Sequence, residues 1–303
     1  MHVDIGIAVA GLGVGFIVGL TGMGGGALMT PLLVLFFRIE PLAAVSSDLV
    51  ASFVMKPVGA GVHLRRGTVN LALVRWLVIG SVPTAFFGAF LLDQLGNGEA
   101  VQDRIKLLLG VALMLAASSM VLRRYLNRGR LDVAGDVPVV VRPLPTVIIG
   151  LAGGLIVGLS SVGSGSLMIV MLLALYPTLT ASQLVGTDLV QAIPLVGAAA
   201  LGHLLFGDFR LGLTGSLLIG AMPGVYVGAR VSSRAPDRLI RPVLIVVLAA
   251  SGLKLLDTPN GAVAGFVVLM AAVAAVHAYR ERARVSSTAH TALTRSSSDS
   301  GRA

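Results

Sequence analysis

Two short segments rich in glycine and small hydroxyl residues interrupt otherwise apolar stretches, at residues 21–26 and 160–166. Glycine lets a ligand approach the backbone closely. A helix that starts directly after such a break has N–H groups without intrahelical partners, and these donors bind anions together with the positive end of the helix dipole. We therefore predict that a small anion binds at Thr21, Gly22, Gly24, Gly25, Gly26, Ser160, Ser161, Gly163, Ser164, Gly165 and Ser166.

Other interpretations of the same segments are weaker. The glycines are also compatible with close helix packing. Gly163-Ser164-Gly165 together with His203 suggests an intramembrane serine hydrolase, but Gly25 is the matching position in the first break, so a nucleophile is not shared. A phosphate-binding P-loop would end in Gly-Lys-Ser/Thr, and neither break does. No histidine–carboxylate cluster has metal-ligand spacing, so we predict no catalytic residue, no metal and no cofactor.

Three ionisable residues lie inside apolar segments, where such groups are costly and usually face a partner or a cavity. Asp48, Ser52 and Lys56 share one side of a helix because they are spaced by four residues. Lys56 either neutralises the bound anion or extends its charge to the arginine-rich membrane boundary. Asp48 and Asp188 either cap a distorted helix start or carry protons.

Four further polar residues accompany this set. Ser47 and Thr187 directly precede the two aspartates, and His63 and His203 lie close to the ends of apolar segments. We expect the histidines to be interfacial, with a role in coupling or gating as the alternative.

The elements that position these residues must lie in a membrane. Apolar residues make up 55% of the 303-residue chain and charged residues only 12%, against about 25% charged in typical soluble proteins. No charged side chain occurs from Ile5 to Phe37, and Asp188 is the only one from Pro143 to Phe206. Uncharged stretches of about 20 residues fit a spanning helix, so the lipid bilayer is a predicted partner.

The net charge of +9 does not indicate nucleic-acid binding, because the arginines occupy short gaps between apolar runs, as in cytoplasmic loops. The segments expected to span are Leu42–Leu64, Val69–Leu92, Ile105–Leu126, Ala181–Phe206, Phe209–Ala229, Leu239–Leu256 and Ala262–Tyr279. The stretches after the two breaks, Ala27–Phe37 and Ser166–Tyr176, are too short to cross alone.

The chain repeats itself. Gly19–Met29 aligns with Gly158–Met168 at an offset of 139 residues, and the offset is 140 from Asp48-Leu49-Val50 and Asp188-Leu189-Val190 onward. Corresponding loops have opposite charge bias, which indicates two copies of opposite orientation, the plan of many secondary transporters.

We therefore expect an all-α polytopic membrane protein with two inverted-topology repeats, each opening with a broken, re-entrant helical hairpin, and about seven to nine transmembrane helices. The expected parts are a first repeat at residues 1–126, a cytoplasmic linker at 127–146, a second repeat at 147–256, an extra helix at 257–280 and a disordered cytoplasmic tail at 281–303. The N-terminus is expected outside the plasma membrane.

The motifs resemble a known family. Gly22–Pro31, Ser46-Ser47-Asp48, His63–Val69, Val185–Leu189 and Gly202–Gly207 are similar to the signatures of the sulfite exporter TauE/SafE family of permeases. Ser46-Ser47-Asp48 stands where the family usually has Gly-Thr-Asp, and Asn70 where an acidic residue is common. The resemblance implies movement of sulfur oxyanions, organosulfonates and related small organic anions.

The resulting prediction is a small-anion transporter, for sulfite, an organosulfonate or a related sulfur or carboxylate anion, that works by alternating access. The prediction leaves room for a coupling proton or cation. The alternative is an anion channel that uses the same polar path.

Overall fold

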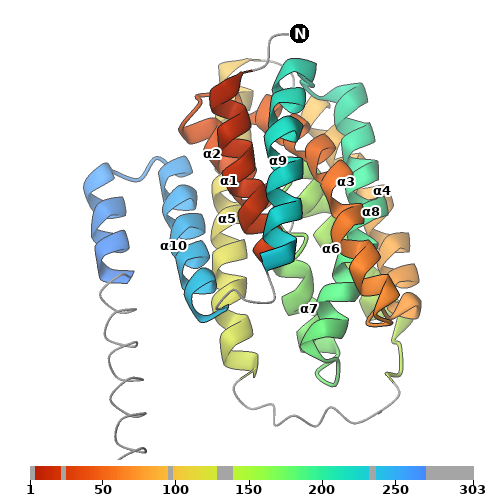
Figure 1. The fold of residues 1–303 in the computed structure, drawn as a ribbon. Helices are drawn as coiled ribbons and strands as arrows, with labels where there is room; N and C mark the ends of the chain where they lie inside the picture. The colour runs from red at the N-terminus through yellow and green to blue at the C-terminus, as the bar shows by residue number, and fades with distance from the viewer. Residues whose placement is uncertain (1–3, 22–24, 95–97, 128–138, 232–236, 271–303) are drawn as a thin grey trace, which may run out of the picture. The chain divides into compact units, whose positions relative to one another are not determined.

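The computed structural model describes residues 4–21, 25–94, 98–127, 139–231 and 237–270. Residues 1–257 form one compact unit and residues 258–303 a second. The described part of the first unit is helical throughout (Figure 1), with α1 at Ile5–Thr21, α2 at Gly26–Leu35, α3 at Pro41–Arg65, α4 at Leu71–Gln94, α5 at Glu99–Asn127, α6 at Pro143–Ser160, α7 at Leu167–Leu175, α8 at Ala181–Phe206, α9 at Leu211–Val231 and α10 at Asp237–Leu255. A further apolar helix, Asn260–Met270, lies in the second unit.

Six described helices are long and apolar enough to cross a membrane, which agrees with a multi-pass membrane protein. They are Pro41–Arg65, Leu71–Gln94, Val101–Arg123, Pro143–Ser160, Ala181–Phe206 and Leu211–Gly228. Two of the seven expected spanning segments are not among these six: the apolar part of α10 is shorter than 18 residues, and Ala262–Tyr279 is described only to residue 270. Pro143–Ser160, which precedes the second break, is long enough although it was not expected to span. The expected last segment, Ala262–Tyr279, the linker 127–146 and the tail 281–303 lie partly or wholly outside the described residues.

Several helix boundaries have a local cause. Pro41 and Pro143 occupy the first turns of α3 and α6, where a missing N–H costs nothing and the fixed φ favours the helix. The Thr180 hydroxyl accepts a hydrogen bond from the Gln183 backbone N–H, and the Gln183 side chain bonds the Thr180 backbone in return, so α8 starts with a capping box. These caps fix where α3, α6 and α8 begin, and therefore where Asp48 and Asp188 lie along them.

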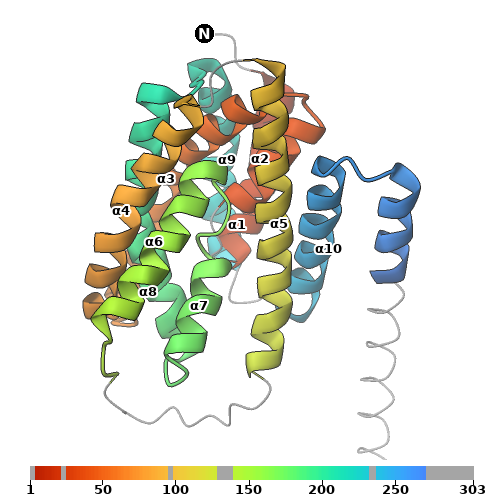
Figure 2. The ribbon, with the colours of Figure 1, turned by 180° about the vertical axis from the view of Figure 1, so that it is seen from behind.

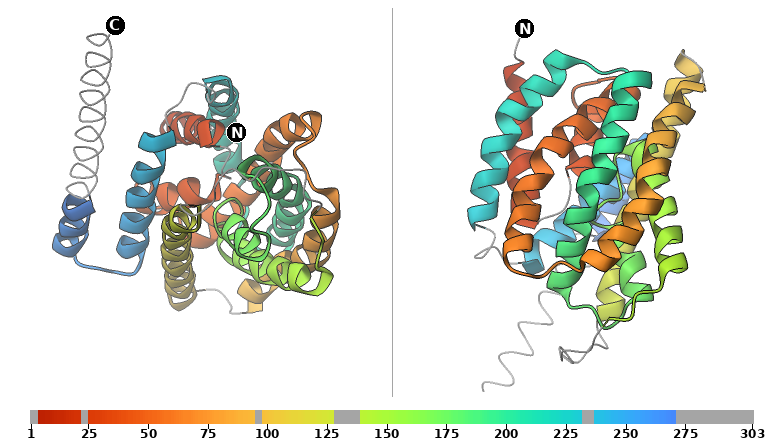
Figure 3. Two further views of the ribbon diagram at one scale, coloured as in Figure 1. Left: turned by 90° about the horizontal axis from the view of Figure 1, so that it is seen from below. Right: turned by 90° about the vertical axis from the view of Figure 1, so that its right-hand side faces the viewer.

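The helices of the first unit pair in a reciprocal pattern (Figures 1 and 3). α1 packs against α9, and its counterpart α6 packs against α4. α3 packs against α8, and α5 against α10. The first helix of each half therefore packs against the fourth helix of the other half, and the two halves do not form separate lobes.

Glycines make the closest of these contacts. On α9, a Cβ atom at Gly220, Gly224 or Gly228 would lie 1.7–2.4 Å from the carbonyl oxygens of Ala8, Leu12 and Phe16 on α1. On α6, Gly150, Gly154 and Gly158 approach the α4 carbonyls of Leu77, Ser81 and Ala85 in the same way, at 2.3–2.4 Å. Small residues at four-residue spacing bring helix backbones together in membranes, and these glycines, which lie outside the two breaks, form such contacts.

We expect the substitution Gly220→Ala to lower the unfolding free energy by about 1–3 kcal/mol, because the added methyl group meets backbone that cannot rotate away. Its Cβ would lie only 1.7 Å from the Ala8 carbonyl oxygen. Thermal unfolding of the purified protein in detergent measures the effect. Gly13→Ala on α1 is the matched control, since nothing lies within 4 Å of a Cβ there. Equal melting temperatures for the two variants would contradict this account of the α1–α9 contact.

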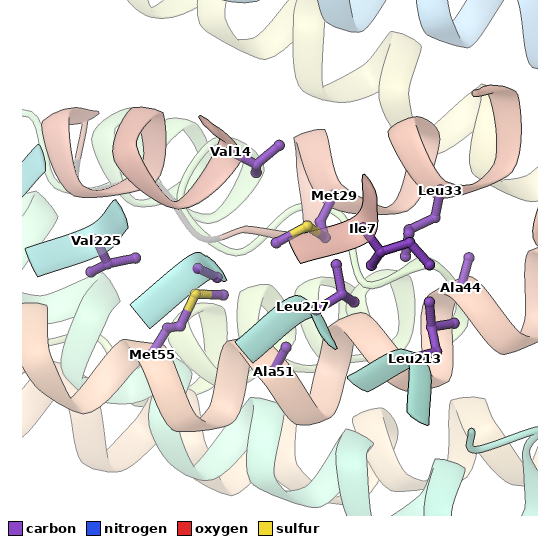
Figure 4. Close-up of a cluster of buried hydrophobic side chains, with 11 residues drawn as sticks. Ile7, Val14, Met29, Leu33, Ala44, Ala51, Met55, Leu213, Leu217 and Val225 are labelled. Carbon is purple, nitrogen blue, oxygen red and sulfur yellow. The ribbon is translucent and has the colours of Figure 1, made fainter. Parts of the chain in front are cut away.

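An apolar core fills the space between α1, α2, α3 and α9 (Figure 4). Met29 and Leu33 of α2 and Leu217 of α9 have no exposed surface. Met55 of α3 joins the same cluster and is 3% exposed. α2 is thus held by apolar packing along its length, which sets the position of its N-terminal end.

Candidate functional site

The first break lies between α1 and α2. Gly25 and Gly26 are buried at the start of α2. The Thr21 hydroxyl donates to the Ile17 carbonyl 2.8 Å away in its own helix. Gly22 and Gly24, also predicted as site residues, lie outside the described residues.

The second break separates α6 from α7, which run in opposite directions in Figure 2. Ser161 ends α6 in the left-handed region with φ of 59°, and Gly163 and Gly165 have φ of 121° and 102°. Glycine adopts such backbone at no steric cost. The Ser160 hydroxyl donates to the Ile156 carbonyl at 2.6 Å and accepts from the Val162 N–H at 3.2 Å. Ser160 therefore satisfies backbone groups at the C-terminal end of α6.

The two breaks touch each other. A Cβ atom on Gly26 would lie 1.9 Å from the Ser161 carbonyl oxygen and 2.7 Å from the Ser161 hydroxyl. A Cβ on Gly25 would face the Ser52 hydroxyl at 3.3 Å and the Asp48 carboxylate at 3.6 Å. The start of α2 therefore lies directly against the C-terminal end of α6. Position 26 must be glycine because a larger residue would not fit between them.

Asp48 lies where the breaks meet and has no exposed surface. Its Oδ2 accepts hydrogen bonds from the Thr30 hydroxyl at 2.9 Å and the Ser161 hydroxyl at 2.7 Å. The Ser52 hydroxyl reaches Oδ1 at 3.4 Å. Donors from α2, from the end of α6 and from α3 itself thus converge on one carboxylate.

Lys56, two helical turns beyond Asp48 on α3, is 6% exposed, and its ammonium group donates to the Ser164 hydroxyl at 3.0 Å. The alternative that Lys56 extends to the membrane boundary is therefore wrong, because its charge points into the second break. Electrostatic attraction links it to both Asp48 and Asp188.

Asp188 on α8 is 2% exposed. It accepts from the Gln191 side-chain amide at 3.0 Å and from the backbone of Gly165 in the second break. Neither aspartate caps the start of its own helix, since both lie well inside α3 and α8. The aspartates therefore do not act as helix caps. Each carboxylate instead accepts a hydrogen bond from a residue of the second break.

The neighbouring hydroxyl residues behave differently from one another. Thr187 accepts from the Asn70 backbone N–H at 3.0 Å, which joins α8 to the start of α4. In the part of the chain that the structure describes, the buried hydroxyls of Ser47 and Ser166 have no hydrogen-bond partner, nor does the side-chain oxygen of Gln191. Ser166 directly precedes α7, two residues after Ser164 in the second break, and among the described residues its hydroxyl is free to donate a hydrogen bond.

The two histidines have unequal surroundings. His203 is fully buried rather than interfacial: its Nε2 bonds the Gly158 carbonyl at 2.8 Å, and its Nδ1 lies 2.9 Å from the Ser46 hydroxyl. Both ring nitrogens of His203 therefore contact groups other than Ser164. His203 is not placed to act as the general base that the serine-hydrolase interpretation requires. His63 is only partly buried and pairs with the Thr68 hydroxyl at 2.9 Å.

Three polar partners were not predicted as site residues. Thr30, Ser52 and Gln191 donate to the two aspartates. The detectable signal was polarity on a buried helical face: Ser52 and Gln191 lie four and three residues after an aspartate, and Thr30 lies within an uncharged run. Among the described residues, no group of three or more His, Cys, Asp or Glu side chains is arranged to hold a metal ion.

Comparison of the sequence with known proteins identifies the family of this chain. The sulfite exporter TauE/SafE profile matches residues 7–255. The chain is 39% identical over 255 residues to the probable membrane transporter protein YjnA of Bacillus subtilis, covering 84% of this chain and 100% of that protein. It is 27% identical over 244 residues to the probable membrane transporter protein YdhB of the same organism, covering 80% and 96%. No solved structure matches the chain significantly. The chain thus belongs to the sulfite exporter TauE/SafE family and is a multi-pass membrane transporter, not an enzyme.

Proposed function

We propose that the protein carries a small anion across the plasma membrane by alternating access, with sulfite, an organosulfonate or a related sulfur or carboxylate anion as substrate. The observation that carries the proposal is the bond from the Lys56 ammonium to Ser164 at 3.0 Å inside the second break. A buried cation next to irregular backbone is the donor arrangement that a desolvated oxyanion needs.

The anion site proposed here lies on the α7 side of the two breaks. Ser164 accepts from Lys56, which leaves its own proton available to a ligand, and the adjoining Ser166 hydroxyl is unpartnered in the described structure. The N-terminal end of α7 adds a positive dipole. The α2 side differs, because the Asp48 carboxylate already occupies the hydroxyl donors there.

Charge balance supports coupling to a cation or a proton. With Asp48 and Asp188 ionised and Lys56 protonated, these three buried groups carry a net charge of minus one. An anion that entered alone would double this charge in a medium of low dielectric, at a high cost in free energy. Uptake of one positive charge with each singly charged anion keeps the net charge constant.

We further propose that the two halves are inverted repeats. The support is the reciprocal pairing, in which α1 with α9 mirrors α6 with α4, while α3 pairs with its own counterpart α8. The charge bias of the loops places Met1 outside and the C-terminal tail in the cytoplasm. Rocking of one half against the other would then expose the shared centre to each side in turn.

Flux measurements on purified protein in liposomes test this function, over sulfite, sulfate, thiosulfate, sulfoacetate and small carboxylates, with and without a pH gradient. We expect saturable flux of at least one anion. Ser164→Ala should raise its half-saturation concentration about tenfold or more, because one hydrogen bond from a neutral hydroxyl to a charged ligand is worth about 1.5–3 kcal/mol.

Ser119→Ala on α5 is the matched control, since Ser119 is also buried but donates to the Ala116 carbonyl of its own helix. Equal kinetics of the two variants would reject the site. Non-saturating flux with single-channel currents would instead establish an anion channel. The burial of Asp48, Lys56 and Ser164, each at most 9% exposed, argues against an open channel.

A further inference from the structure

Asp48 is a buried carboxylate with no adjacent cation in the described structure. It has no exposed surface, and the ion pairs formed by described residues do not include it. Lys56 attracts it electrostatically, but the hydrogen bond of that ammonium goes to Ser164. The same ammonium is also attracted by Asp188. A single lysine shared by two buried carboxylates leaves negative charge uncompensated, which is expensive, so a group that supplies a further positive charge would be bound strongly here.

The atoms that surround Asp48 are oxygens from three separate elements. They are the hydroxyls of Thr30 at 2.9 Å, Ser161 at 2.7 Å and Ser52 at 3.4 Å. The Ser161 carbonyl oxygen lies beside Gly26 in the same contact. Hydroxyl groups can rotate and present a lone pair, and carboxylate, carbonyl and hydroxyl oxygens are the ligands of hard cations.

The backbone around Asp48 has the polarity that attracts a cation. Ser161 follows the last turn of α6, where the helix dipole is negative. In broken membrane helices, unwound carbonyls and the C-terminal ends of half-helices coordinate sodium. Gly25 keeps space beside the carboxylate, since a Cβ there would lie 3.3 Å from Ser52 Oγ and 3.6 Å from Asp48 Oδ1.

The corresponding Asp188 provides an internal comparison. It accepts from the Gln191 amide and the Gly165 backbone, and both Lys56 and Arg123 attract it. Its donors include nitrogen groups that cannot ligate a cation, whereas the side-chain donors that the described residues offer to Asp48 are hydroxyl groups. The two aspartates occupy matching positions in the chain but have different ligand chemistry.

We propose that Asp48 forms a binding site for a monovalent cation of sodium size, with Thr30 Oγ1, Ser161 Oγ and the Ser161 carbonyl oxygen as further ligands. One carboxylate balances one positive charge, whereas a divalent ion would leave an excess beside Lys56. As a coupling site it rests on the proposed anion transport, but cation binding itself can be measured without any substrate anion.

The test is thermal unfolding and calorimetry of the purified full chain in sodium, potassium or choline chloride, at fixed pH and ionic strength. We expect sodium to raise the melting temperature saturably, as a ligand of the native state does. Asp48→Asn should remove the sodium effect, and Asp188→Asn should retain it. Melting temperatures independent of the cation, or a sodium effect that survives Asp48→Asn, would overturn the proposal.

Two milder variants keep the test decisive if Asp48→Asn does not fold. Gly25→Ala adds one methyl group beside the carboxylate and should weaken sodium binding about tenfold, as other changes near metal ligands do, while Gly13→Ala should not. Thr30→Val should weaken binding and Thr30→Ser preserve it. If Gly25→Ala and Thr30→Val both bind sodium as the wild type does, the site is wrong.

Two outcomes separate this proposal from anion transport. Anion flux that continues in choline medium, with no sodium binding, would overturn the cation site and leave the proposed transport intact. Sodium binding at Asp48 with no flux of any anion would support the site and overturn the transport function. If protonation alone shifts the melting temperature and Asp48→Asn removes that shift, Asp48 carries a proton and the sodium site is rejected.

Discussion

Replacing Lys56 by Met should reduce anion affinity by at least about tenfold, since a hydrogen bond to a charged group is worth about 1.5–3 kcal/mol. Lys56 is 6% exposed and supplies the ammonium group at the second break. The measurement is anion flux into liposomes as a function of concentration, combined with calorimetric binding.

The same substitution leaves the Asp188 carboxylate without the lysine that attracts it, so the variant should also be less stable. The double variant Lys56→Met/Asp188→Asn is the control, because it removes both charges and should recover stability without recovering anion affinity. Recovery of both would mean that Lys56 serves only to balance Asp188. Unchanged anion binding in Lys56→Met would place the substrate elsewhere.

Much of the helical framework could be predicted from the sequence because uncharged runs and helix breakers are local signals. The expected segments Leu42–Leu64 and Ala181–Phe206 correspond to α3 at Pro41–Arg65 and α8 at Ala181–Phe206. Both breaks lie where consecutive glycine and serine residues interrupt the apolar pattern. The single anion site predicted at residues of both breaks requires that the breaks lie close together, and Gly26 does lie against Ser161.

The pairing of polar side chains could not be predicted in the same way. Asp48 binds Ser161 across 113 residues of chain, and this contact depends on the relative positions of α2, α3 and α6. Residue type alone left both capping and proton transfer compatible with an aspartate. The structure removes capping of its own helix, because the caps at Glu40 and Thr180 start α3 and α8 well before the aspartates.

Burial explains why the interfacial assignment failed for His203 alone. Nearness to a helix end suggests solvent or lipid headgroups, but the side of α8 that carries His203 is packed against α4, α6 and the start of α3. Gly202 packs against Ala89 of α4, and the ring nitrogens of His203 bond Ser46 and Gly158. A histidine that satisfies the Gly158 carbonyl in the last turn of α6 is a structural partner of the second break. No sequence pattern distinguishes it from His63.

Replacing Gly26 by Ala should abolish anion flux while the matched change Gly25→Ala preserves it at saturating cation concentrations. A methyl group at position 26 would lie 1.9 Å from the Ser161 carbonyl oxygen and 2.7 Å from the Ser161 carbonyl carbon, so one break must move away from the other. At position 25 the nearest atoms are 3.2 Å or more away, and the nearest is the flexible end of Met55.

Movement of Ser161 would also withdraw its hydroxyl from Asp48, which now accepts a hydrogen bond from it at 2.7 Å. The added methyl group would thus also change the electrostatic surroundings of the Asp48 carboxylate. Overpacking of this kind costs about 1–3 kcal/mol, and thermal unfolding of both variants therefore accompanies the flux assay. A Gly26→Ala protein that remains folded but does not transport would show that the contact between the breaks is needed for function. Wild-type flux in that variant would mean that transport does not depend on the two breaks touching, and the site would then have to be sought away from Gly26 and Ser161.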